Sequence, residues 1–300
     1  MTSAKIIADS ISHFGVRLTT FEVVMHRFVL AEFNTHRQFS RNSASSRAIP
    51  VEKQLAKVVE NPAWPIEWAS EQPGMQGGSE LDGDALADAT QLFVDLHEHT
   101  TVEIERYLAA HPDKADRLHK SLLNRLLEPF MWHTVVVTST EWQNFFNQRA
   151  SEFSPLAQPE IRLAADMMLQ AYRDSEPVEV EAGQWHLPYI TQADWDDIAL
   201  MDLSDLDAIQ VLKKVSVARC ARVSYLTHDG RRDLEEDVTL YERLISARPM
   251  HASPLEHVAT PATRGEIEEG NVLGNFFGWH QLRHEIQIVE PDSITSATAG

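Results

Sequence analysis

The stretch with the richest set of chemically useful side chains lies between Thr35 and Arg47. It holds one His, three Arg, one Asn, one Thr and four Ser, and it contains no Lys, Asp or Glu. Planar guanidinium groups and small hydroxyls suit the oxygens of phosphates and carboxylates. The composition therefore favours an anion-binding loop for a phosphorylated ligand, although a solvated, Ser-rich surface loop has the same composition.

Other common catalytic patterns are missing from the sequence or poorly placed. The chain has no GxGxxG, no GxxxxGK[ST] and no HExxH segment. His251 and His257 are six residues apart across Pro254, a poor spacing for two zinc ligands on one helix. Cys220 lies in an expected helix among apolar and small residues, which favours an inert buried thiol over a nucleophile.

The overall composition limits the class of protein. The chain has 300 residues, 43% of them hydrophobic, and a net charge of −19. This length fits one large domain or two smaller ones, and the charge argues against duplex nucleic acid or an anionic membrane as partner. One cysteine excludes an internal disulfide. Neither a signal-peptide core nor an apolar run of about 18 residues is present, so we expect a soluble, cytoplasmic protein.

The elements that must position the Arg- and Ser-rich stretch follow from periodicity and from Pro and Gly. β-branched, alternating runs predict strands over 6–8, 16–25 and 135–138, and the apolar run at 28–30 reads as a continuation of the second. Helical spacing predicts helices over 51–61, 84–111, 114–127, 142–150, 159–172, 208–221 and 238–246. We expect a loop excursion over 62–83, a connecting segment over 176–206 and a frayed tail from Pro291.

Five segments together resemble one protein family. The pattern His36-Arg37-x-x-Ser40-x-x-x-x-Ser45-x-Arg47 resembles the signature of flavin-dependent thymidylate synthases, which usually has Arg where this chain has Thr35. The other four similar segments are Arg125–Pro129, Asn147–Arg149 with Ala157–Arg162, Ala221–Ser224 and His251–His257. The last two precede the signature in typical members but follow it here, so the chain resembles a circularly rearranged member.

The resemblance implies an α/β fold of the α+β type, with a central, mainly antiparallel sheet flanked by helices. It implies a single domain over 1–300, with a signature and nucleotide-binding part at 15–175 and a flavin-binding part at 208–290. It also implies FAD as cofactor and methylation of a uracil nucleotide at C5. Methylenetetrahydrofolate and NADPH would be co-substrates, and the sites would lie at subunit interfaces of a homotetramer.

The resemblance also gives individual residues a role. Arg162 would act catalytically beside the uracil ring, where a fixed positive charge favours ionisation of the ring and electron density at C5. Residues that would bind the substrate are Ser43, Ser45, Arg47, Arg125 and Arg162. Residues that would bind the flavin are His36, Arg37, Asn42, Asn147, Arg149, Ser224, His251, Ser253 and Glu256.

Three positions depart from the usual family pattern and leave the substrate open. Thr35 removes a charged contact, Ser43 stands where many members have Glu, and Glu32 stands near a usual amide. Members that resemble this chain include phage-type enzymes acting on dUMP and enzymes of polyoxin-type nucleoside-antibiotic pathways acting on UMP. A flavin- or nucleotide-binding protein without catalysis is a further alternative.

Overall fold

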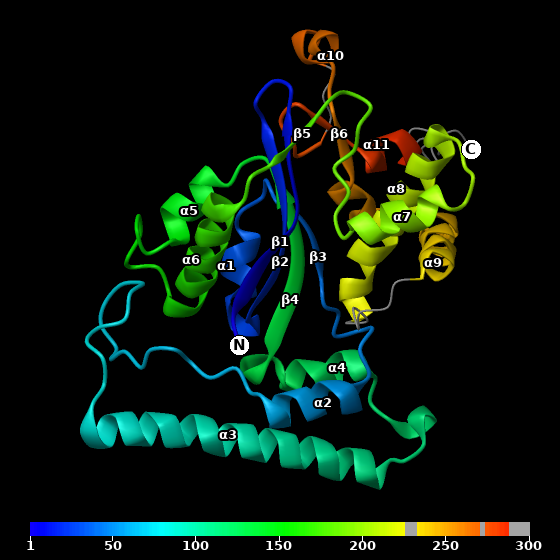
Figure 1. The fold of residues 1–300 in the computed structure, drawn as a ribbon. Coiled ribbons are helices and arrows are strands. Elements are labelled where there is room, and N and C mark those ends of the chain that lie inside the picture. Colours follow the sequence, from blue (N-terminus) through cyan, green and yellow to red (C-terminus); the bar gives the residue numbers. More distant parts are fainter. Residues whose placement is uncertain (226–232, 271–273, 288–300) are drawn as a thin grey trace, which may run out of the picture.

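A computed structural model describes residues 1–225, 233–270 and 274–287. In this part of the chain five strands form a central sheet in the order β3-β4-β2-β1-β5 (Figure 1). Neighbouring strands are antiparallel, except that β5 runs parallel to β1. The strands are β1 (Ser3–Ser12), β2 (Arg17–His26), β3 (Ser40–Ser43), β4 (Trp132–Ser139) and β5 (Val178–Val180). The predicted α/β fold with a mainly antiparallel sheet is confirmed.

One face of the sheet carries the largest apolar core. Phe21 and Val23 of β2 and Val135 and Val137 of β4 are fully buried and belong to one cluster. Alternate strand residues point to the same face, which explains their spacing of two. Helices α5 (Gln143–Arg149) and α6 (Pro159–Asp174) complete this cluster. The apolar positions of the sequence predicted both helices near these bounds.

The opposite face packs against helices from the C-terminal part of the chain. Val136 of β4 meets Cys220 and Val223 there. Helix α8 (Asp205–Arg222) and the 3-10 helix η5 (Ser253–His257) pack together on this side. Figure 1 shows α7 (Gln192–Ala199), α8, α9 (Leu234–Ser246) and α11 (Leu282–Gln287) on one side of the sheet, with α5 and α6 on the other. Helices from separate parts of the chain thus flank the same strands.

A third group of helices lies at one end of the sheet, at the bottom of Figure 1. It consists of α2 (Val51–Glu60), α3 (Gly83–Ala110) and α4 (Lys120–Leu126), which share an apolar cluster. The prediction of one helix over 114–127 is wrong. A short 3-10 helix, η2 (Lys114–Asp116), is separated from α4 by extended backbone at Arg117 and His119. His119 then caps α4 by accepting a hydrogen bond from the Ser121 N–H.

The apolar run after β2 is helical, which corrects the prediction of a strand at 28–30. The 3-10 helix η1 (Arg27–Val29) leads into α1 (Leu30–Asn34). Val29 and Phe33 are both fully buried and four residues apart, a helical spacing that the short run concealed. This turn of helix places the following residues, Thr35 onward, beside α5.

The remaining segments complete the part of the chain that the structure describes. The elements are the 3-10 helices η3 (Glu128–Phe130) and η4 (Val223–Tyr225), helix α10 (Arg264–Glu268), and a small antiparallel sheet of β6 (Ala259–Pro261) and β7 (Trp279–Gln281). The connection at 176–206 holds β5 and α7, and its buried Asp194 pairs with Arg219 of α8. Residues from Pro291 lie outside the described residues. No helix among those described is long and apolar enough to cross a bilayer.

Candidate functional site

The C-terminal half of the Arg- and Ser-rich stretch lines a cavity of about 630 Å³, the Arg47 cavity. Six of the predicted site residues meet there: Asn42, Ser45, Arg47, Ser224, His251 and Ser253. They come from three segments separated by up to about 200 residues in the chain. The fold therefore gathers residues that were assigned separately to the substrate and to the flavin.

Local hydrogen bonds hold the stretch in this cavity. After β3, the Ser45 N–H donates to the carbonyl oxygen of Ser224 at 3.1 Å. The fully buried Asn124 side chain donates to the carbonyl oxygens of Ser46 and Ile49, at 2.9 and 3.0 Å. These bonds fix the turn that carries Arg47, whose side chain is exposed.

The Arg47 cavity is basic in a strongly acidic chain. Arg47 and Lys120 contribute positive charge, and among the residues that the structure describes none that lines the cavity is Asp or Glu. Lys120 is held in place, since its Nζ donates to the carbonyl oxygen of Ala48 at 2.8 Å. Sequence reasoning missed Lys120 and His119, which belong to no recognised motif and reach the cavity only because α4 packs against the turn.

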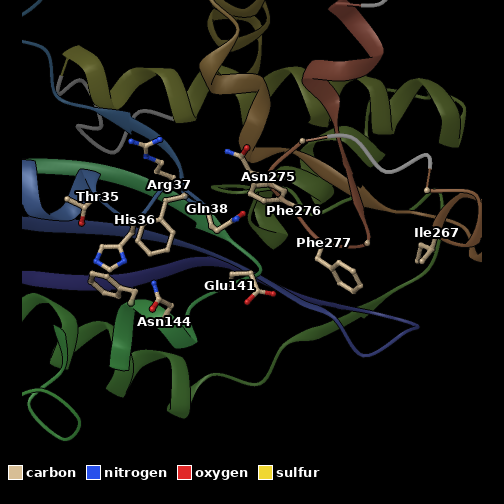
Figure 2. Close-up of a pocket in the computed structure, with 15 residues that line it drawn as sticks. Thr35, His36, Arg37, Gln38, Glu141, Asn144, Ile267, Asn275, Phe276 and Phe277 are labelled. Atoms are coloured by element: carbon tan, nitrogen blue, oxygen red, sulfur yellow. The ribbon is translucent and has the colours of Figure 1, made fainter. Parts of the chain in front are cut away.

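The start of the stretch lines a different cavity, of about 660 Å³, the His36 cavity. Figure 2 shows Thr35, His36 and Arg37 around it together with Asn144 of α5, Glu141 and the segment Asn275–Phe277. Aromatic rings, amide groups, one guanidinium and one carboxylate thus line this cavity. Asn144 and the 275–277 segment had no predicted ligand-binding role, and the predicted Asn147 does not line this cavity.

The histidine of this cavity is neutral at physiological pH. Burial, together with the nearby positive charges of Arg149 and Arg41, lowers the pKa of His36 to about 4. Arg149 donates from Nε to Nε2 of His36 at 3.3 Å, which requires an unprotonated acceptor nitrogen. The structure therefore brings together two of the predicted flavin contacts, His36 and Arg149.

Arg162 lines a third cavity of about 670 Å³, the Arg162 cavity. Its Nη1 donates to the carbonyl oxygens of Pro155 and Ala157, at 2.5 and 3.4 Å, and its Nη2 pairs with Glu67. Helix α6, which carries Arg162, covers the face of the sheet opposite α8 (Figure 1). Within one chain, Arg162 and Arg47 therefore line separate cavities.

Five of the predicted residues line none of these three cavities: Arg149, which contacts His36 as described above, and four others. Arg125 is exposed and pairs with Glu128 at 3.2 Å. Asn147 is exposed and accepts a hydrogen bond from Gln143 at 2.7 Å. The other two are Ser43, which is half-buried at the end of β3, and Glu256, which pairs with Arg283.

The surroundings of Cys220 and His257 indicate structural roles for both residues. Cys220 is fully buried, as predicted, and burial raises the pKa of its thiol well above the usual range, which disfavours the reactive thiolate. His257 is a core residue whose Nδ1 lies 2.8 Å from the Thr138 hydroxyl. Among the described residues no cluster of three or more His, Cys, Asp or Glu could hold a metal ion.

Comparison with known proteins gives structural likenesses only. No family model and no curated protein matches the sequence. A UMP/dUMP methylase PolB from Streptomyces cacaoi, solved with 5-Br dUMP, aligns with 57% of this chain and 90% of its own, at 16% identity and a TM-score of 0.43. Thymidylate Synthase X from Helicobacter pylori, solved with FAD and dUMP, aligns with 52% and 67%, at 15% identity and a TM-score of 0.34. Likenesses this distant carry no argument about ligands, which rests on the side chains described above.

Proposed function

We propose that the chain is a flavin-dependent enzyme that methylates C5 of a uracil nucleotide monophosphate. The observation that carries the proposal is the Arg47 cavity. There the fold gathers residues from three of the five segments that resemble the flavin-dependent thymidylate synthases, 42–47, 221–224 and 251–254, although their order in the chain is rearranged. A surface loop that was merely solvated would not be expected to meet both other segments.

The Arg47 cavity suits the phosphate of the nucleotide. Arg47 offers a planar pair of N–H donors, and Ser45 and Lys120 add a hydroxyl and a second positive charge at the same cavity. Since no described residue that lines it carries a carboxylate, the cavity attracts an anion although the chain carries a net charge of −19. Asn42 is already engaged, because its Nδ2 donates to the Cys220 carbonyl oxygen at 3.3 Å, so we assign it to shaping the cavity wall.

The His36 cavity suits the flat, amide-bearing ring system of FAD. Phe276 and Phe277 offer apolar contact, Asn144 and Asn275 offer amide hydrogen bonds, and Arg37 offers a charge for a phosphate. When bound and reduced by NADPH, the flavin supplies the hydride that turns the one-carbon unit of methylenetetrahydrofolate into a methyl group. Neutral His36 accepts a hydrogen bond and adds no charge beside the ring.

Arg162 is assigned to the uracil ring, where its guanidinium would stabilise negative charge as it develops on the ring. Since Arg162 and Arg47 line cavities on opposite faces of the sheet, one chain does not offer both to one small nucleotide. A site that uses both needs a second copy of the chain. We therefore propose a homo-oligomer, a tetramer by resemblance, with composite sites between subunits.

We propose that residues near the bound nucleotide determine whether the substrate is dUMP or UMP. Ser43 ends β3 and is half-buried. Within one chain Ser43 lines none of the three cavities, so we place it at the edge of the site, next to Asn42 of the Arg47 cavity. Its side chain is shorter than the Glu found in many similar proteins and carries no negative charge, so it would leave room for a ribose 2′-hydroxyl. This observation favours, as a second candidate, a UMP methylase of the nucleoside-antibiotic type.

A paired assay tests the proposal. Purified protein is expected to show flavin absorbance and to convert dUMP or UMP into its 5-methyl product with methylenetetrahydrofolate and NADPH. Turnover of both nucleotides side by side decides between the two substrates. Flavin binding without turnover of either would instead favour the non-catalytic alternative, and a colourless, inactive protein that takes up no FAD would refute the proposal.

A further inference from the structure

Part of the segment at 62–83, expected to be a loop excursion, is folded into a short hairpin at 68–81, and the residue just before it, Glu67, contacts Arg162. The Leu81 N–H donates to the Trp68 carbonyl oxygen at 2.7 Å, and the Ser70 N–H donates to Ser79 at 2.8 Å. The hairpin requires glycine at Gly77, because a Cβ there would lie 2.4 Å from the Ala69 Cβ. The segment is therefore a built structure with a defined backbone.

Four contacts hold the residues that lead into this hairpin against the rest of the protein. The Ala63 N–H donates to the Phe130 carbonyl oxygen at 2.9 Å, and the ring of His26 donates to the Trp64 carbonyl oxygen at 2.8 Å. The Ile66 N–H donates to a carboxylate oxygen of buried Glu160 at 2.9 Å. The Trp68 ring packs edge-on against Phe93 of α3, with 5.0 Å between ring centres.

Glu67 stands between two of these anchors, Ile66 and Trp68, and its carboxylate pairs with Nη2 of Arg162. The other end of the guanidinium donates to the carbonyl oxygens of Pro155 and Ala157. Three acceptors from two separate segments thus hold the plane of one guanidinium. The Arg162 side chain is 22% exposed, so it is still accessible from the Arg162 cavity.

We propose that Glu67 is a positioning residue that holds the Arg162 guanidinium in its productive orientation toward the uracil ring. The inference rests on the proposed function, because it takes Arg162 as the residue that faces the ring. An exposed ion pair adds little to stability, so the pair acts through orientation. The contacts that anchor this segment then have a role in the site, because they hold the Glu67 carboxylate at a fixed position beside α6.

The test compares Glu67→Ala and Glu67→Gln in single turnover with reduced flavin, so that flavin reduction does not limit the rate. Glu67→Ala is expected to slow methyl transfer about tenfold, because misplacing a reacting group by about 1 Å costs a large factor in rate. The nucleotide Kd, measured by calorimetry, should change less than about threefold, since the effect is on orientation and not on binding. Glu67→Gln keeps an acceptor oxygen for Nη2 and should recover most of the rate.

Glu71→Ala is the matched control, since Glu71 is an exposed carboxylate of the same hairpin, and it should behave as wild type. In an Arg162→Lys background, Glu67→Ala should slow methyl transfer much less, because lysine lacks the planar guanidinium that Glu67 orients. Thermal unfolding verifies that each variant is folded. A Glu67→Ala rate equal to or above wild type, with Arg162→Ala inactive, would overturn the role of Glu67 and leave the proposed function standing. Wild-type protein inactive on both nucleotides would overturn both.

Discussion

Arg47→Ala is expected to weaken nucleotide binding through loss of a phosphate contact. Arg47 is exposed and lines a cavity in which no described residue offers a carboxylate, and its backbone N–H donates to the Ser45 hydroxyl. Removing its side chain should therefore leave the fold intact. Its loss should act on the ligand's phosphate and not on the uracil ring.

The expected size follows from the kind of bond and from its exposure. A hydrogen bond to a charged group contributes about 1.5–3 kcal/mol, and about 1.4 kcal/mol is tenfold in affinity. Because Arg47 lies at the surface, we take the lower part of this range, a loss of about ten- to thirtyfold in Kd. Lys120, which lines the same cavity, keeps the loss from being larger.

Calorimetric titration with dUMP, UMP and uridine measures this effect directly. Arg47→Ala should weaken both nucleotides, leave the weak binding of uridine unchanged and reduce the salt dependence of nucleotide affinity. Arg106→Ala is the control, because Arg106 is an exposed arginine on α3 paired with Glu103. Unchanged nucleotide affinity in Arg47→Ala, or an equal loss for uridine, would refute the assignment of the phosphate to this cavity.

Two further predictions concern stability. Arg219→Ala should lower the free energy of unfolding by about 3–5 kcal/mol, because it removes the ion pairs that Arg219 makes with the buried Asp194 and Asp237 carboxylates, although Asp237 keeps its pair with Arg222. Arg264→Ala removes an exposed pair and should cost about 0–1 kcal/mol; equal unfolding midpoints for the two variants would contradict this reading. The urea midpoint should also fall between pH 7 and pH 5, since burial lowers the pKa of several histidines to about 3 or 4, so the unfolded chain binds protons that the native chain excludes. This stability is fully present above about pH 6.5 and is lost as the pH falls toward the folded values, so a flat midpoint would refute it. The histidines are His36, His133, His186 and His257.

Hydrophobic periodicity was sufficient to predict the long helices and strands. It was insufficient for short segments whose structure is determined by contacts with distant parts of the chain. The run at 135–138 is a strand because β-branched residues alternate between two buried faces. The run at 28–30 is equally apolar but too short for its period to be read, and it is helical. The hairpin at 68–81 depends on pairing within a Pro- and Gly-rich segment, for which composition predicts only a loop.

The candidate site shows the same limit. Motif spacing pointed to Ser45, Arg47 and His251, which the fold does bring to one cavity. Lys120 could not be found this way, because it reaches that cavity from α4 through a contact with Ala48. Glu67 was likewise outside every motif. Arg162 was found, but no sequence pattern could show that it lies apart from Arg47 within one chain.

The central claim is most directly tested by following the hydrogen at C5 of the uracil ring. Protein loaded with FAD is supplied with NADPH, methylenetetrahydrofolate and dUMP or UMP tritiated at C5. The account predicts release of tritium to water with formation of the matching 5-methyl nucleotide, and loss of both in Arg162→Ala. Retention of the tritium in both nucleotides by a folded, flavin-loaded protein would contradict it.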